Sequence, residues 1–246
     1  MGDPFTVIFM NLILLQDDDF TSVDRVRLTG RRLEHVKTVH RACVGDELRV
    51  GRLNGYLGRG KIIALDDRCL ELVDLVLDQP PPPPSPVTLL LALPRPKMLK
   101  RVLQSVSSLG VKEIYLLNSY RVDKSFWSSP LLSGEKLREQ LLLGLEQARD
   151  TVVPRVTLCP RFKPFVEDNL PTVAAGSAAF VAHPGAGTVC PHALGEKITL
   201  AIGPEGGFIP YEVEKFQECG FVPVTLGERI LRVETAVPVL LSRLHV

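Results

Sequence analysis

The chain has 246 residues, of which 45% are hydrophobic and 23% charged, and its formal net charge is +1. These values are typical of a soluble globular protein, and the near-zero charge does not by itself indicate a nucleic-acid partner. No run reaches the roughly 18 apolar residues of a membrane span. The first residues also lack the basic region and cleavage site of a signal peptide. From these two observations we expect no membrane partner.

The five cysteines are dispersed along the chain, and no two of them have the C-x-x-C spacing. An odd and scattered set argues against a disulfide framework and against a zinc site. Reduced thiols are typical of the cytosol. We therefore expect a cytoplasmic protein that needs no metal.

Residues 10–79 contain short strand patterns that are separated by turn residues. The Asn54-Gly55 dipeptide is a strong hairpin signal. We expect one helix around 32–39 and strands at 12–15, 26–28, 47–52, 58–64 and 70–77. So many short strands in about 70 residues are typical of a small closed or half-open β-barrel.

The positive charge of this region lies between Arg25 and Lys61, where ten lysines and arginines occur with three acids; we call these ten cations the basic stripe. A basic stripe on a small barrel is typical of proteins that bind phosphate backbones. A solvated surface without a partner is the other interpretation. Charge alone does not decide between the two.

A proline-rich run occupies residues 80–86. Such a run adopts polyproline II and acts as a semi-rigid spacer. Binding of an SH3-type partner is the less favoured interpretation, because the chain has no other low-complexity segment. We therefore expect a domain at 10–79, a linker at 80–86 and a second domain at 87–246.

Beyond the linker, apolar runs alternate with segments of helical spacing. We expect strands at 87–93, 113–117, 178–182, 198–202 and 221–225. We expect helices at 97–109, 135–149, 211–219 and 235–244. This alternation predicts an α/β domain with a mainly parallel sheet.

Two glycine-bearing loops follow the last two of these strands: Ile202-Gly-Pro-Glu-Gly-Gly-Phe208 and Leu226-Gly-Glu-Arg-Ile-Leu-Arg-Val-Glu-Thr235. An open α/β sheet binds its ligand at the carboxyl ends of its strands, and we take these two strands as neighbours. Gly203, Gly206 and Gly207 leave no Cβ between backbone and ligand, and we expect Gly206→Val to abolish binding. Neither dinucleotide nor P-loop spacing is met, so we expect a flat, mostly uncharged ligand. Taken alone, either loop would be an ordinary turn.

Together the motifs I-G-P-E-G-G-F and L-G-x-R-I-L-R-x-E-T-A, the second at 226–236, resemble the ribosomal small-subunit RNA uridine-N3 methyltransferases of the knotted SPOUT class. The resemblance covers nearly the whole chain. It implies a PUA-like RNA-binding barrel, a SPOUT domain with a trefoil knot, S-adenosylmethionine as cofactor and 16S rRNA of the small ribosomal subunit as partner. It also implies a homodimer, which we expect independently because the segment 236–244 is apolar over most of its circumference.

The resemblance places the cofactor where three loops converge. The implied cofactor-binding residues are His183, Ile202, Gly203, Pro204, Glu205, Gly206, Gly207, Leu226, Gly227, Arg229, Ile230, Leu231 and Arg232. A structural role is equally open for His183, as is core packing for the leucines. Similarity of the basic stripe to the PUA-like domain favours RNA binding by Arg31, Arg32, His35, Lys37 and Arg41. Met10-Asn-Leu-Ile-Leu resembles the usual start of the family, which would make residues 1–9 an extension.

Methylation of uracil N3 needs one group that stabilises negative charge on the base and another that accepts the N3 proton. Arg232 is the candidate for the first role. Glu234 is a candidate for the second, although a favourable interaction with the helix dipole is the preferred interpretation. Arg149 resembles the arginine of the family motif E-Q-[SC]-x-R, but it stands one position early, which puts its role in question.

Three other functions stay open at this point. Methylation of a ribose 2′-oxygen or of another base position fits the same fold class. A catalytically silent RNA-binding homologue is favoured by the shifted arginine and disfavoured by the intact motif at 229–236.

Overall fold

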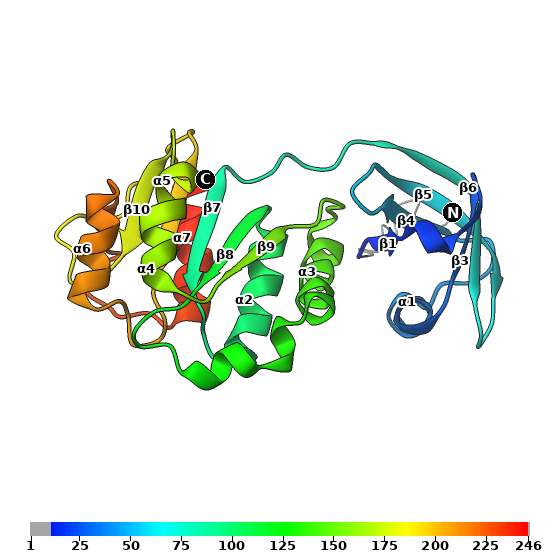
Figure 1. The fold of residues 1–246 in the computed structure, drawn as a ribbon. Coiled ribbons are helices and arrows are strands. Elements are labelled where there is room, and N and C mark those ends of the chain that lie inside the picture. Colours follow the sequence, from blue (N-terminus) through cyan, green and yellow to red (C-terminus); the bar gives the residue numbers. More distant parts are fainter. Residues whose placement is uncertain (1–10, 246) are drawn as a thin grey trace. The chain divides into compact units, whose positions relative to one another are not determined.

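The computed structural model describes residues 11–245, which divide into two compact units (Figure 1). The N-terminal unit comprises 11–82 together with Leu145–Val153, and the C-terminal unit comprises Pro83–Gly144 and 154–245. The first break falls inside the proline run. The inclusion of Leu145–Val153 in the N-terminal unit was not predicted. The expected start at Met10 lies outside the described residues.

The N-terminal unit is a six-stranded, mostly antiparallel sheet with the strand order β1-β4-β5-β6-β3-β2. Only the β1–β4 pair is parallel. The strands are β1 (Ile13–Leu15), β2 (Phe20–Ser22), β3 (Arg25–Leu28), β4 (Glu47–Arg52), β5 (Leu57–Leu65) and β6 (Leu70–Gln79). The five predicted strands are confirmed, whereas the short β2 and the 3-10 turn before it, Asp17–Asp19, were missed.

The core of the N-terminal unit follows from strand alternation. In β3, Val26 and Leu28 are buried, whereas Arg25 and Arg27, which alternate with them, are exposed, as expected for a sheet with one face inward. The helix α1 (Gly30–His35), which continues as a wider π-type turn over Val36–His40, adds Leu33 and Val36 to the same core. The predicted helix is therefore present.

The predicted hairpin joins β4 to β5, and its turn forms hydrogen bonds with the segment Leu145–Val153. Asn54 has a φ of 57°, the left-handed conformation that asparagine tolerates in tight turns. Its N–H donates to the Thr151 carbonyl at 2.8 Å, and its side-chain oxygen accepts from the Val153 N–H at 3.0 Å. The Leu12 N–H donates to the Glu146 carbonyl. These bonds explain why this segment packs with the N-terminal unit.

The C-terminal unit is a six-stranded sheet in which all pairs are parallel, with the order β12-β10-β11-β7-β8-β9. Its strands are β7 (Val87–Ala92), β8 (Glu113–Leu117), β9 (Arg155–Cys159), β10 (Ala178–Ala182), β11 (Ile198–Ile202) and β12 (Val222–Val224). The prediction that the strands before the two glycine loops are neighbours is wrong, because β10 lies between β11 and β12. Their carboxyl ends still share one edge of the sheet.

Helices pack against this parallel sheet. They are α2 (Pro96–Ser108), α3 (Gly134–Ala148), α6 (Pro210–Glu218) and α7 (Val233–His245), with shorter turns at Lys124–Ser128, Pro130–Leu132, Phe162–Pro164, Phe165–Asn169 and Leu170–Val173. The four long helices confirm the predictions, whereas the short turns and β9 were missed. In α2 the buried residues recur at helical spacing (Leu99, Val102, Leu103, Val106), and α2 lies beside α7 (Figure 1).

The apolar helix α7 is largely covered within the C-terminal unit. Val237, Leu240, Leu241 and Leu244 are buried, and Val239 is 41% exposed. The argument that its apolar circumference requires a second subunit is therefore wrong, since one chain buries four of the five side chains. Within residues 11–245, no helix combines the length and the apolar character needed to cross a membrane.

Candidate functional site

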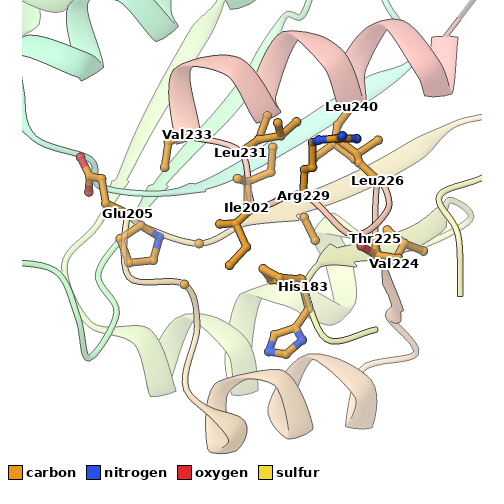
Figure 2. Close-up of a pocket in the computed structure, with 17 residues that line it drawn as sticks. His183, Ile202, Glu205, Val224, Thr225, Leu226, Arg229, Leu231, Val233 and Leu240 are labelled. Carbon is orange, nitrogen blue, oxygen red and sulfur yellow. The ribbon is translucent and has the colours of Figure 1, made fainter. Parts of the chain in front are cut away.

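A hollow lies at the carboxyl edge of the parallel sheet, where the loops after β10, β11 and β12 meet the start of α7 (Figure 2). We call it the ligand hollow. It holds about 660 Å³ of space between protein atoms. Its lining residues are Ala182, His183, Pro184, Ile202, Gly203, Pro204, Glu205, Gly207, Val224, Thr225, Leu226, Arg229, Ile230, Leu231, Val233, Ala236 and Leu240. Three separate loops thus converge as the sequence predicted.

The first loop of the ligand hollow requires glycine at two positions. A Cβ on Gly203 would lie 2.9 Å from the Phe208 amide nitrogen and 3.1 Å from Gly207 backbone atoms. Gly207 has a φ of +73°, and its N–H donates to the Pro204 carbonyl at 2.7 Å. Because backbone packs against backbone here, the loop presents main-chain groups to the hollow with no side chain between them.

Of the three predicted glycines, Gly203 and Gly207 line the ligand hollow and Gly206 does not. A Cβ on Gly206 would meet the Arg121 side chain, with Cδ at 2.9 Å. The Arg121 guanidinium also donates to the Gly206 carbonyl. Contact between Gly206 and the cofactor stays a prediction.

The second loop supplies apolar walls. Leu226, Arg229, Ile230 and Leu231 line the ligand hollow, whereas Gly227 and Arg232 do not. In Figure 2 the side chains of Ile202, Leu226, Leu231 and Leu240 surround the space, and the Glu205 carboxylate stands at its margin. Aliphatic walls beside exposed backbone groups suit a flat ring whose edge is hydrogen-bonded.

His183 accepts a hydrogen bond within its own turn. Its Nδ1 accepts the Gly185 N–H at 3.1 Å, which closes the turn after β10. In Figure 2 its ring points away from Leu226 and Leu231. His183 thus lines the hollow mainly by its position at the end of β10.

A second hollow adjoins the first and holds two of the predicted catalytic residues. We call it the cationic hollow, and its lining residues are Arg95, Lys97, Met98, Arg101, Glu205, Ile230, Leu231, Arg232 and Glu234. Glu205, Ile230 and Leu231 line both hollows. The Glu205 carboxylate accepts the Arg95 N–H at 3.1 Å, which joins the first glycine loop to the start of α2. The α2 cations were missed from the sequence, although they directly follow a predicted strand.

A family model of the RNA methyltransferase domain matches residues 81–245 of this chain. The chain belongs to this family of RNA methyltransferases. Ribosomal RNA small subunit methyltransferase E of Treponema pallidum is 29% identical over 232 residues, which cover 92% of the chain and 87% of that protein.

Solved structures share the fold of this methyltransferase. The ribosomal RNA small subunit methyltransferase E of Neisseria gonorrhoeae, bound to S-adenosyl methionine, matches with a TM-score of 0.70 at 22% identity, covering 94% of this chain and 95% of that one. A methyltransferase of Legionella pneumophila, in complex with the same cofactor, matches with a TM-score of 0.73 at 22% identity, covering 95% and 96%. The mixed α/β architecture, with a curled, mainly antiparallel sheet followed by a parallel one, is thereby confirmed.

Arg149 of this methyltransferase belongs to the N-terminal unit and lines neither hollow. It follows α3 with a φ of 56°. On one side of it, the Glu146 carboxylate forms two hydrogen bonds of 2.5 and 2.9 Å with Arg31. On the other, Asp150 is buried and accepts the Val152 N–H. The shifted motif therefore contributes to the packing of the N-terminal unit, and a catalytic role of Arg149 stays a prediction.

Three of the five RNA-binding candidates form ion pairs within the N-terminal unit. Arg31 pairs with Glu146, Arg32 with Asp19 and Lys37 with Asp67. The Arg32–Asp19 pair is the most enclosed, with side-chain exposures of 17% and 9%, and Arg32 also donates to the Leu14 carbonyl. The hydrogen bond to Asp67 raises the pKa of Lys37. His35 is partly exposed and Arg41 is exposed.

The part of the chain that the structure describes contains no candidate metal-binding site. Among residues 11–245, no group of three or more His, Cys, Asp and Glu side chains could hold a metal ion. The five cysteines are unpaired thiols, and burial raises the pKa of Cys159 to about 11.

Proposed function

We propose that this chain is an S-adenosylmethionine-dependent methyltransferase that acts on N3 of a uridine in the 16S rRNA of the small ribosomal subunit. The observation that carries the proposal is the ligand hollow, where the apolar walls of Leu226 and Leu231 meet the bare backbone of Gly203 and Gly207. The name of the Treponema relative and the cofactor bound in the Neisseria and Legionella structures support it.

The residues of the ligand hollow fit S-adenosylmethionine. Three loops and the start of α7 enclose it, and most of its lining is aliphatic. Leu226, Leu231 and Ile202 provide apolar surface for an adenine ring. Backbone N–H and C=O groups of the two loops can read the ring's polar edge, since the glycines leave them uncovered. When bound there, the cofactor supplies an electrophilic methyl group.

The cationic hollow provides the groups that N3 methylation needs. Arg232 and Glu234 both line it, and within the described residues neither side chain has an ion pair or a hydrogen bond. We assign to Glu234 the acceptance of the N3 proton, and to Arg232 the stabilisation of the negative charge that spreads over O2 and O4 of uracil. The N3 lone pair forms the new C–N bond as the methyl carbon loses its bond to sulfur.

We also propose that the N-terminal unit is a PUA-like RNA-binding domain and that the chain end forms a trefoil knot. A curled sheet with a basic stripe supports the first proposal. The loop after β10 supports the second: the N–H groups of Ala193 and Leu194 donate to the carbonyls of Arg243 and Leu244, and Arg243 donates to the Cys190 carbonyl. These bonds hold the loop against the last turn of α7.

A cytoplasmic homodimer completes the proposal, and it rests on the family resemblance. Val239 is the exposed apolar side chain of α7 that could meet a second subunit. Light scattering on the wild type and on Val239→Asp tests this assembly. A wild type that is monomeric and fully active at nanomolar concentration would contradict it.

Transfer of labelled methyl from S-adenosylmethionine to isolated small ribosomal subunits and to naked rRNA tests the activity. We expect label in the RNA with the wild type and loss of both cofactor binding and transfer with Leu231→Asn. Leu109→Asn is the matched control, because Leu109 is 37% exposed, as Leu231 is 36% exposed, and lines neither hollow. A wild type that binds RNA and transfers nothing would support the silent RNA-binding alternative.

A further inference from the structure

A cluster of basic side chains adjoins the ligand hollow. The cationic hollow is lined by four basic side chains, Arg95, Lys97, Arg101 and Arg232, and by two carboxylates, Glu205 and Glu234. The four basic residues are exposed. Within residues 11–245, none of the four side chains has an ion pair or a hydrogen bond. Four cations and two carboxylates leave the hollow with a net charge of +2 (4 − 2), and a bound anion relieves the repulsion among the cations.

The basic stripe of the N-terminal unit differs in this respect. Six of its ten cations are paired with carboxylates: Arg27, Arg31, Arg32, Lys37, Arg52 and Arg59. Pairing with a carboxylate lowers the charge that such a side chain offers to a phosphate, and the release of the carboxylate opposes binding. The cationic hollow thus offers uncompensated charge where much of the stripe does not.

The position of the cationic hollow indicates which anion it binds. It shares Glu205, Ile230 and Leu231 with the ligand hollow, so an anion bound there adjoins the ligand hollow. Lys97 and Arg101 are four residues apart on one face of α2 and about 6 Å apart along its axis, so their side chains can reach different phosphates of one strand. Ile230 is 80% exposed between the two hollows and offers an apolar surface to an extruded base.

We propose that Arg95, Lys97 and Arg101 bind the phosphates that flank the target uridine, so that the C-terminal unit itself holds the RNA strand over the ligand hollow. This inference rests on the proposed function. RNA binding is then not confined to the N-terminal unit, and the cationic hollow positions the strand while Glu234 and Arg232 act on the base.

The test compares two double variants that remove the same charge. Lys97→Gln/Arg101→Gln alters the cationic hollow, and Lys124→Gln/Arg138→Gln is the matched control on exposed residues that line neither hollow. Affinity for a short single-stranded RNA of the target sequence is measured by fluorescence anisotropy over a range of salt concentrations. Each lost phosphate contact lowers the slope of log K against log salt by about 0.7 for a single strand, so we expect a decrease of about 1.4 in the first variant only.

Three outcomes are distinguishable. A slope in Lys97→Gln/Arg101→Gln equal to that of the wild type and the control overturns the inference. Competition of inorganic phosphate for the hollow, with unchanged RNA slope, overturns it in favour of a small-anion site. Calorimetric affinity for S-adenosylmethionine should stay unchanged in both variants, because neither pair lines the ligand hollow. If the wild type binds the cofactor but transfers methyl to no RNA, the proposed function fails, whereas a slope that falls in Lys97→Gln/Arg101→Gln alone still supports RNA binding at the cationic hollow.

Discussion

Substitution of Gly203 by alanine should damage the cofactor site in a way that can be sized from the structure. The added Cβ would lie 2.9 Å from the Phe208 nitrogen, whereas ordinary contact begins at 3.4 Å, so backbone must move by 0.5 Å (3.4 − 2.9). All three nearest atoms are backbone, and no rotamer change can relieve the contact. Overpacking of this kind costs about 1–3 kcal/mol.

This strain should appear as weaker binding of S-adenosylmethionine. Since about 1.4 kcal/mol is tenfold in affinity, Kd in Gly203→Ala should rise between about 5-fold and 140-fold if the loop must regain its shape to bind. Strain already present in the free protein would instead lower Tm by about 2–4 °C per kcal/mol. Calorimetry therefore measures the part of the strain energy that weakens cofactor binding, and thermal unfolding measures the part that destabilises the free protein.

Gly206→Ala is the matched control for Gly203→Ala. Neither glycine has a positive φ, and both belong to the same loop. The Cβ on Gly206 meets the Cδ of Arg121, a flexible side chain that can move away. We expect its Kd within about twofold of wild type, since surface changes usually stay within about 0.5 kcal/mol. Wild-type affinity and wild-type Tm in Gly203→Ala would refute the reasoning.

Two further predictions concern the N-terminal unit and the cysteines. Asp19→Asn leaves the enclosed Arg32 charge without its partner and should lower the free energy of unfolding, measured by urea titration, by about 3 kcal/mol. The control Glu47→Gln removes the exposed 4.0 Å pair with Arg59 and should change that free energy by less than about 1 kcal/mol. Equal effects of the two substitutions would contradict the role given to burial. Because burial raises the pKa of Cys159 from its ordinary 9.0 to about 11, its alkylation in the folded protein should increase about tenfold per pH unit up to about pH 11, and a plateau near pH 9 would contradict this shift.

Local signals were sufficient for most elements of the fold. The strands β8, β10 and β11 have the predicted bounds, because each is a short apolar run between turn residues. The hairpin at Asn54-Gly55 was also predicted from the sequence, because this dipeptide is typical of a two-residue turn whose first residue is left-handed. In contrast, β9 has an exposed and half-buried pattern as an edge strand, so its sequence carried little apolar periodicity.

The order of the strands in the sheet and the contacts between distant residues could not be predicted from the sequence. The placement of β10 between β11 and β12 depends on how the crossovers pack, which no local pattern records. Likewise, Arg31 and Glu146 are 115 residues apart, and their pairing follows only from the fold. The glycine loops revealed that a ligand site exists, but which glycine faces it depends on backbone direction. For that reason the close backbone contact that makes glycine necessary at position 203 was visible only in the structure.

The identity of the methylated nucleoside tests the central claim most directly. Small ribosomal subunits that lack the modification are incubated with the protein and S-adenosylmethionine labelled on the methyl group, and the 16S rRNA is digested to nucleosides and separated by liquid chromatography with mass detection. The account predicts that the label elutes as 3-methyluridine, and that Arg232→Gln and Glu234→Gln reduce it while cofactor affinity is kept. Label in a 2′-O-methyl nucleoside or in another base would contradict it.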